Sequence, residues 1–318
     1  MSADARQGSP ADAPPRFSGI RTFARQPHTR ELDGVDVAVA GVPFDQGTSF
    51  RPGARFGPEA IRSASVLLRP YHQALGLDVL GSQRVVDWGD TVISPGNAER
   101  GVGQIAEQLA EIISAGASTL VLGGDHLVAL AELRALAARH GPLGLVLLDS
   151  HADTWDSYGG ERYFHGTPFR RAVEEGLVEP ERSLLAGMRG PLYSAGDLDE
   201  ARELGFELVQ WHDLCEIDPG EYGRRVRERV AGGPAFLSFD VDFVDPAFAP
   251  ATGTPEPGGP SSAVAIGFVR ALGGIGFAGF DVVEVSPPYD GPGQITSLLA
   301  ANVAYEMLAL AARGGGGA

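Results

Sequence analysis

Acidic and histidine side chains are concentrated in three short segments, each at the end of an apolar run. The segments read GGDH at 123–126, DSHAD at 149–153 and SFDVD at 238–242. Six potential ligands result, four carboxylates and two imidazoles without a thiolate: His126, Asp149, His151, Asp153, Asp240 and Asp242. Carboxylates at the ends of buried strands are costly to desolvate and repel one another, so divalent cations are expected among them. We interpret the pattern as a two-metal site.

The spacing within these segments supports that interpretation. Residues 149, 151 and 153 are two positions apart, so an extended segment would point their side chains in the same direction. Asp240 and Asp242 repeat the spacing. Oxygen-rich ligand sets with a minority of imidazole suit hard or borderline ions such as Mn²⁺, whereas a structural zinc site normally includes cysteine. The expected cofactor is therefore Mn²⁺, two ions per chain.

The elements that must position these ligands read as alternating strands and helices. Strand-like apolar runs lie at 35–41, 84–90, 118–124, 144–150, 183–189, 206–211, 235–241 and 277–285. Helical patterns, with apolar residues three and four positions apart, lie at 58–68, 97–115, 127–139, 166–177, 220–231, 261–272 and 294–312. This alternation predicts a three-layer α/β/α fold with a mostly parallel sheet of about eight strands. The site of such a sheet lies beyond the carboxyl ends of its strands, where the metal segments fall.

A single catalytic domain is expected over residues 34–313, although a length of 318 residues would also allow about two domains. Residues 1–33 are rich in Ala, Pro, Arg and Gln, and they should form an N-terminal arm that is partly flexible. The Gly-rich tail at 314–318 should be disordered. The Pro- and Gly-rich stretch at 250–260 directly follows a metal segment, so it is expected to be an ordered loop of the site.

Composition narrows the classes of partner. A formal charge of −16, from 25 basic and 41 acidic residues, argues against a nucleic-acid partner and mildly favours a cationic substrate. No uninterrupted apolar run reaches the roughly 18 residues of a spanning helix, and the first residues lack the apolar stretch of a secretory signal. The single cysteine, Cys215, fits a reducing compartment. We expect a cytoplasmic protein without a membrane partner.

Further motifs make the chain resemble the ureohydrolases, the family of agmatinases, arginases and related guanidino-compound hydrolases. The resemblance runs from about Gly41 to Ala309 and is closer to agmatinases and guanidino-acid amidinohydrolases than to arginases. It includes GVPFDQGTSFRPGARFGPEAIR at 41–62, HGTPFRRAVEEGL at 165–177, DVDFVDPAFAPATGTPEPGG at 240–259 and DVVEVSPPYDGPGQITSLLAAN at 281–302. The resemblance implies the arginase–deacetylase-like fold, a small guanidino-compound substrate and a homo-oligomer, trimeric or hexameric.

The resemblance also implies two ligand sets. The first is His126, Asp149, Asp153 and Asp240, and the second is His151, Asp149, Asp240 and Asp242. Asp149 and Asp240 would bridge the two ions. A water or hydroxide shared by the ions would attack the guanidinium carbon at neutral pH.

Catalytic roles follow from the same resemblance. Glu284 would pair bidentately with the guanidinium N–H groups. Asp153 would hydrogen-bond the hydroxide and pass its proton toward the leaving amine, and His165 would be the proton shuttle. Thr254 would help to shape the pocket.

Two positions depart from the common family motifs, which read DAHxD and GGDHS or GGDHT. This chain has Ser150 and Leu127 at the differing positions, and neither is an expected ligand. Ser150 is expected to alternate away from the metals and Leu127 to open a helix. Both changes should adjust packing around the ligands without loss of activity.

For several other residues, a role in the substrate pocket is weighed against a structural role. Arg189 could meet a substrate carboxylate or brace a loop, and the brace is favoured. Trp155, Tyr158 and Tyr163 could wall the pocket or pack between subunits, and the sequence does not decide between these. The remaining histidines are expected to be structural: His28, His72, His140 and His212.

Arginine is disfavoured as the substrate. In arginases, stretches before and after the shuttle histidine hold the α-amino and α-carboxylate groups, whereas this chain has ERYFHG at 161–166 and RGPLYS at 189–194. Agmatine, giving urea and putrescine, is the favoured substrate. The alternative is a guanidino acid: 4-guanidinobutyrate, 3-guanidinopropionate or a proclavaminate-type precursor. A zinc-dependent deacetylase on the same fold is less favoured. Such an enzyme holds a single metal with two aspartates and a histidine, whereas this chain has all six ligands of a two-metal site.

Overall fold

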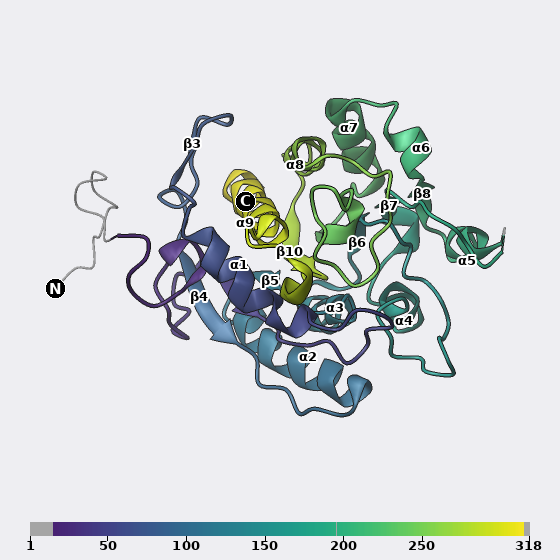
Figure 1. Ribbon diagram of the computed structural model, residues 1–318, viewed down its shortest axis with the longest axis horizontal. Helices are drawn as coiled ribbons and strands as arrows, with labels where there is room; N and C mark the ends of the chain where they lie inside the picture. The colour runs from purple at the N-terminus through teal and green to yellow at the C-terminus, as the bar shows by residue number, and fades with distance from the viewer. Residues whose placement is uncertain (1–14, 195, 315–318) are drawn as a thin grey trace.

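The computed structural model describes residues 15–194 and 196–314. Its centre is a sheet of eight parallel strands in the order β4-β1-β5-β10-β9-β6-β7-β8 (Figure 1). The strands are β1 (Val37–Gly41), β4 (Val85–Asp90), β5 (Ser118–Leu122), β6 (Gly144–Leu148), β7 (Leu184–Ala186), β8 (Glu207–Val209), β9 (Ala235–Asp240) and β10 (Phe277–Val283). The predicted strands and the parallel sheet are thereby confirmed.

Helices cover both faces of this sheet. The longer ones are α1 (Gly57–Ser65), α2 (Ala98–Ser114), α3 (Val128–His140), α4 (Pro168–Glu174), α7 (Pro219–Arg229), α8 (Ser262–Arg270) and α9 (Ile295–Gly314). Successive residues of a strand point to opposite faces. Val37 and Val39 accordingly pack in the core under α1 and α9, and Ala38 and Ala40 in the core under α2 and α3. The predicted three-layer architecture is confirmed.

Several short helices, strands and turns were not predicted from the sequence. They are α5 (Asp197–Glu203), α6 (Trp211–Leu214), the hairpin of β2 (Tyr71–His72) and β3 (Leu77–Asp78), and the 3₁₀ turns Phe23–Arg25, Ala54–Phe56, Pro180–Arg182, Val241–Phe243 and Pro287–Tyr289. Each is too short to show a clear period. Helix α5, for example, buries only Leu198 and Ala201.

Part of the expected N-terminal arm packs against the sheet. Phe23 is fully buried, and its backbone N–H donates to the Asp87 carboxylate on β4 at 2.7 Å. The same carboxylate pairs with Arg62 of α1 at 2.8 Å. Residues 1–14, which complete the arm, lie outside the described residues. At the other end, Gly314 belongs to α9 and not to the expected tail, whose remaining residues 315–318 also lie outside the described part.

Helix α9 is long and apolar enough to cross a membrane, judged by length and composition alone. In the structure, 72% of its most apolar window is buried inside the protein. The helix packs against β10, α1 and α8. Its apolar composition is therefore accounted for by its place in the core.

Candidate metal centre and active site

The four central strands deliver all of the predicted ligands to one edge of the sheet. Strands β5, β10, β9 and β6 are neighbours, and their carboxyl ends lead into GGDH, Glu284, Asp240 and DSHAD respectively. The GGDH turn needs glycine, because a Cβ atom at Gly124 would overlap the carbonyl oxygen of Phe44. The chain before α1 is thereby held directly against the metal segment.

One cluster forms around His126, whose side chain is fully buried. Its Nδ1 atom lies 2.9 Å from Asp153 Oδ2, 3.1 Å from Asp149 Oδ2 and 3.4 Å from Asp240 Oδ2. These are the four residues of the first expected ligand set. The structure therefore brings them together around one nitrogen atom.

A second cluster forms around His151. Its Nδ1 atom lies 3.1 Å from Asp242 Oδ2 and 3.6 Å from Asp149 Oδ1. Asp149 thus turns one carboxylate oxygen toward each histidine, as a bridging ligand would. Asp149 Oδ1 also accepts the backbone N–H of His151 at 2.6 Å, and Asp240 Oδ1 likewise accepts that of Asp242 at 2.7 Å. Asp240 Oδ2 faces His126 at 3.4 Å. A bridging role for Asp240 remains a prediction.

The chemistry of these residues fits divalent cations. His126 Nδ1 and Asp149 Oδ2 are buried, and neither makes a hydrogen bond among the described residues. Burial, together with the negative charges of Asp242 and Asp149, raises the pKa of Asp240 well above its usual range. A cation between these groups would relieve both the repulsion and the desolvation. Two groups within the described chain could each hold an ion, His126–Asp149–Asp153 and Asp149–His151–Asp242.

A hydrogen-bond chain behind His126 fixes its tautomer. Ser238 Oγ donates to Asp281 Oδ1 at 2.6 Å, so the 2.8 Å contact with His126 is best made by Nε2–H donating to Ser238. His126 Nδ1 is then left with a lone pair for a metal. The sequence reading missed both Ser238 and Asp281. The available signal was a polar side chain inside each of two otherwise apolar strands.

Replacing Asp281 by Asn is expected to weaken Mn²⁺ binding by about 10- to 100-fold. The Asn amide can donate to Ser238, which would then donate to His126 Nε2 and move the ring proton onto the metal-facing nitrogen. Competition with a chelating dye measures the affinity. Asp199→Asn, on the exposed surface of α5, is the matched control. Equal affinity of the Asp281 variant and the wild type would contradict this role.

Ser150 does not alternate away from the ligands, and that expectation was wrong. Its Oγ atom donates to Asp242 Oδ1 at 2.6 Å and lies 3.2 Å from His151 Nδ1. The extended backbone ends with β6, so the two-residue alternation does not continue into the DSHAD loop. Leu127 caps α3 as expected. Thr254 lines the pocket and donates to Asp242 Oδ2 at 3.4 Å.

Glu284 and His165 form a buried pair beside the clusters. His165 Nδ1–H donates to Glu284 Oε1 at 2.9 Å, and the backbone N–H of His126 donates to the same oxygen at 2.9 Å. Glu284 Oε2 has no hydrogen-bond partner among the described residues. Burial lowers the pKa of His165, but the charge and hydrogen bond of Glu284 outweigh it and raise the pKa to about 9.

Two of these functional residues have a left-handed backbone. Glu284 has φ of 63° and Asp153 has φ of 50°. In this conformation the Glu284 N–H donates to the Gly124 carbonyl at 2.8 Å, which anchors the end of β10 to the GGDH turn. The carboxylate of Glu284 is turned toward His126 and His165 as a result.

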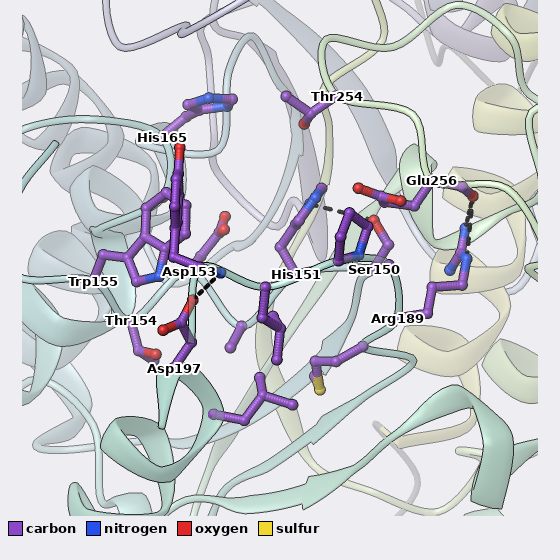
Figure 2. Close-up of a pocket in the computed structure, with 18 of the residues that line it drawn as sticks. Ser150, His151, Asp153, Thr154, Trp155, His165, Arg189, Asp197, Thr254 and Glu256 are labelled. Carbon is purple, nitrogen blue, oxygen red and sulfur yellow. Dashed lines mark hydrogen bonds between the residues drawn. The ribbon is translucent and has the colours of Figure 1, made fainter. Parts of the chain in front are cut away.

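A pocket of about 260 Å³ opens above the clusters. Figure 2 shows Trp155 and His165 on one side of it, and Arg189 and Glu256 on the other. Trp155 stacks on Tyr158 with ring centroids 6.1 Å apart, and both line the pocket. Tyr163 instead packs against the core under α3, with the Arg134 guanidinium 5.9 Å from its ring.

Arg189 is a brace, as predicted. Its guanidinium donates to the backbone carbonyls of Asp242 at 2.8 Å, Phe243 at 2.9 Å and Glu256 at 2.7 Å. It therefore ties the end of β7 to the metal loop after β9 and to the 250–260 loop. The carboxylates that line the pocket away from the clusters are Asp197 and Glu256.

Two of the remaining histidines have structural partners. His28 Nδ1 lies 3.0 Å from the Asp87 carbonyl oxygen. His72 lies 2.9 Å from the Glu306 carboxylate and stacks on Tyr305. The pocket is lined by neither of them, nor by His140 or His212.

Comparison with known proteins agrees with this geometry. The arginase family model matches residues 35–309. The chain is 48% identical to a guanidinobutyrase of Pseudomonas aeruginosa over 92% of this chain and 93% of that protein, and 40% identical to a mitochondrial agmatinase of Gallus gallus over 96% and 92%. The structure of proclavaminate amidinohydrolase from Streptomyces clavuligerus superposes with a TM-score of 0.90 at 42% identity, covering 95% of this chain and 100% of that one. The chain therefore belongs to the arginase family of hydrolases that act on guanidino C–N bonds.

Proposed function

We propose that the chain is a binuclear manganese hydrolase that releases urea from a linear guanidino compound. The observation that carries the proposal is the shared carboxylate of Asp149, which turns one oxygen to His126 and the other to His151, a residue that lines the pocket. The oxygen-rich ligand set supports Mn²⁺ over Zn²⁺. Bound there, the ions would supply a Lewis acid and a water activated for attack at neutral pH.

The protein's own groups would orient the substrate. Glu284 does not itself line the pocket, but its buried Oε2 makes no hydrogen bond among the described residues and lies behind His165, which does line it. This oxygen would accept a guanidinium N–H of a substrate that reaches past His165. Glu284 Oε1 already accepts hydrogen bonds from His165 and from the His126 backbone N–H. We therefore expect Glu284 to accept one N–H of the substrate guanidinium through Oε2 instead of two in a bidentate pair. Fixing the guanidinium plane in this way supplies the orientation that a poor electrophile needs.

Proton transfer would fall to Asp153 and His165. Both line the pocket, and Asp153 Oδ2 also faces the first cluster. The leaving amine must gain a proton when the C–N bond breaks, and a positioned imidazole can supply it. Asp153 would hydrogen-bond the hydroxide and pass its proton toward the leaving amine, as the family resemblance implies.

Agmatine is the proposed substrate, because the charges of the pocket favour a cationic tail. The carboxylates of Asp197 and Glu256 line it away from the clusters. The guanidinium of Arg189 is directed at backbone carbonyls, so it is not free to bind a carboxylate. An ammonium at the far end of the substrate would complement these acids.

A guanidino acid is the second candidate. It is favoured by the 48% identity with a guanidinobutyrase and by the fold match with proclavaminate amidinohydrolase. The tail of such a substrate is a carboxylate, which the two acids of the pocket would repel. The two candidates therefore predict opposite preferences for the charge of the tail.

A urea-release assay on the manganese-loaded protein tests both proposals. Agmatine, 4-guanidinobutyrate, 3-guanidinopropionate, a proclavaminate-type precursor and arginine are compared at equal concentration. Agmatine is expected to give the highest kcat/KM, and arginine the lowest. Turnover of a guanidino acid alone would reject agmatine and keep the reaction, whereas no urea from any compound would reject the reaction itself.

Metal content and assembly are tested independently. About two manganese ions per chain after loading would support the binuclear site, while one zinc would favour the deacetylase alternative. A trimeric or hexameric homo-oligomer remains a prediction from the family resemblance. Light scattering coupled to size-exclusion chromatography would measure it.

A further inference from the structure

We propose that Ser49 is a catalytic residue that orients His165 and relays a proton between His165 Nε2 and the pocket. This inference rests on the proposed function. Ser49 lies 116 residues before His165 in the sequence, in the loop between β1 and α1. The pairing is therefore visible only in the folded chain.

The loop that carries Ser49 is clamped to His165 through the backbone. The Gly47 N–H donates to Asp125 Oδ2 at 2.7 Å, and the Gly47 carbonyl accepts the His165 N–H at 3.0 Å. The approach is close, since a Cβ atom at Gly47 would lie 3.1 Å from the His165 nitrogen. These contacts hold the Ser49 hydroxyl at a defined place beside the imidazole.

Both ring nitrogens of His165 have a partner. Nδ1 faces Glu284 Oε1 at 2.9 Å, and Nε2 faces Ser49 Oγ at 2.8 Å. The Ser49 backbone N–H also points to Nε2, at 3.3 Å. When the imidazole is neutral, a carboxylate on Nδ1 and donors on Nε2 together select the tautomer that carries its proton on Nδ1.

A hydroxyl is a suitable hydrogen-bond partner for a group that gains and loses a proton. When His165 is neutral, Ser49 Oγ–H can donate to Nε2. When His165 is protonated, Nε2–H can donate to Ser49 Oγ, since a hydroxyl is both donor and acceptor. The contact therefore persists in both protonation states of His165.

Ser49 also connects the imidazole to the pocket. Glu284 is 1% exposed and His165 is 7% exposed, whereas Ser49 is an exposed residue that lines the pocket. The buried carboxylate, the imidazole and the hydroxyl form a series that leads outward to where the leaving amine would lie. A proton that leaves His165 Nε2 therefore meets Ser49 Oγ first.

The transfer balances without a further reactant. The Nε2–H bond of His165 breaks as a bond forms from that proton to Ser49 Oγ. The hydroxyl proton of Ser49 passes to the nitrogen of the leaving amine, so Ser49 ends neutral, with one proton. The net change is one proton moved from His165 to the amine.

Three variants distinguish proton transfer through the Ser49 hydroxyl, which we call the relay, from a role of Ser49 in packing alone. Ser49→Ala removes the hydroxyl, and Ser49→Thr keeps it. Ser94→Ala removes a hydroxyl on the loop between β4 and α2. This hydroxyl accepts a hydrogen bond from Gln104 of α2 and makes none with His165 among the described residues. All three are prepared as full-length, manganese-loaded protein and assayed with the best substrate of the urea-release panel.

Ser49→Ala is expected to lower kcat by about 10- to 100-fold, which is below or at the low end of what a general acid contributes, because His165 remains. KM should change much less. Ser49→Thr and Ser94→Ala should retain near wild-type kcat. The solvent deuterium isotope effect on kcat should indicate more than one moving proton in the wild type and a single one in Ser49→Ala.

A measurement without turnover keeps the test independent of the reaction. In metal-free protein, the ¹⁵N resonance of His165 Nε2 should move in Ser49→Ala, where the hydroxyl contact is lost, and stay in place in Ser94→Ala. An unmoved resonance, unchanged kcat in Ser49→Ala, or equal loss in Ser49→Thr and Ser49→Ala would each overturn the proposal. If the wild type released no urea from any compound, the proposed function would fail, and the relay with it, even if the resonance moved.

Discussion

Replacing Asp149 by Ala is expected to abolish retention of both metal ions and to lower kcat/KM by at least about 10³-fold, as loss of a residue that acts within a catalytic unit does. The effect is the largest we expect from one substitution, because Asp149 faces His126 with one oxygen and His151 with the other. Metal analysis after gel filtration measures retention, and the urea assay measures turnover. Two ions still bound to the variant would contradict the shared position.

Thermal unfolding adds a second readout for Asp149→Ala. Burial raises the pKa of the Asp149 carboxyl, but the nearby imidazoles of His126 and His151 outweigh it and hold the pKa well below its usual range. The ionised carboxylate therefore stabilises the metal-free protein, and the substitution should lower its melting temperature even without metal. Saturating Mn²⁺ should stabilise the wild type by about 2.7 kcal/mol at 100 times Kd, and this gain should vanish in the variant. Asp213→Ala, at an exposed aspartate next to His212, is the matched control and should change neither metal content nor turnover.

Replacing Glu284 by Gln is the second change with a large expected effect. It should lower kcat by about 10²- to 10⁴-fold, because the carboxylate orients His165 and offers its free oxygen to the substrate. The pKa of His165, about 9 in the presence of the carboxylate, should fall toward its ordinary value of about 6.5. NMR titration of the metal-free protein measures that pKa. A His165 pKa that stays high would show that Asp153 and Asp125, which also raise it, dominate.

The same variant has a predicted pH signature in stability. Because the folded-state pKa of His165 is raised, its pair with Glu284 contributes stability fully below pH of about 6.5 and loses it as pH rises through about 9. The difference in unfolding free energy between wild type and Glu284→Gln should therefore narrow over that range. Glu306→Gln is the matched control for the loss of a buried carboxylate that pairs with a histidine, since Glu306 pairs with His72 at the same 2.9 Å but has no contact with His165 among the described residues.

The two clusters of carboxylates and histidines were predictable because their polar residues follow apolar strands. Asp149, Asp240 and Glu284 follow strands that are otherwise apolar, and a parallel sheet brings such strand ends together. The residues behind the ligands were not predictable. Ser238 and Asp281 meet only because β9 lies beside β10, which the chain order does not indicate.

Loops set the other limit of sequence-based prediction. Trp155, Tyr158 and Tyr163 lie within nine positions of one another, yet the first two line the pocket and the third, partly buried, packs against the core. Ser150 faces Asp242 because backbone alternation ends with β6. In each case the direction of a side chain depends on loop backbone, which has no period to read.

The left-handed backbone at Asp153 and Glu284 carries an energetic consequence for the whole chain. A non-glycine residue held in this region costs about 1 to 3 kcal/mol, and aspartate tolerates it better than glutamate. Glycine would relax both positions but would delete a metal-facing carboxylate and the partner of His165. Glycine at either position should therefore raise thermal stability and lower turnover. The packing of the surrounding core must offset the conformational free energy that these two residues cost.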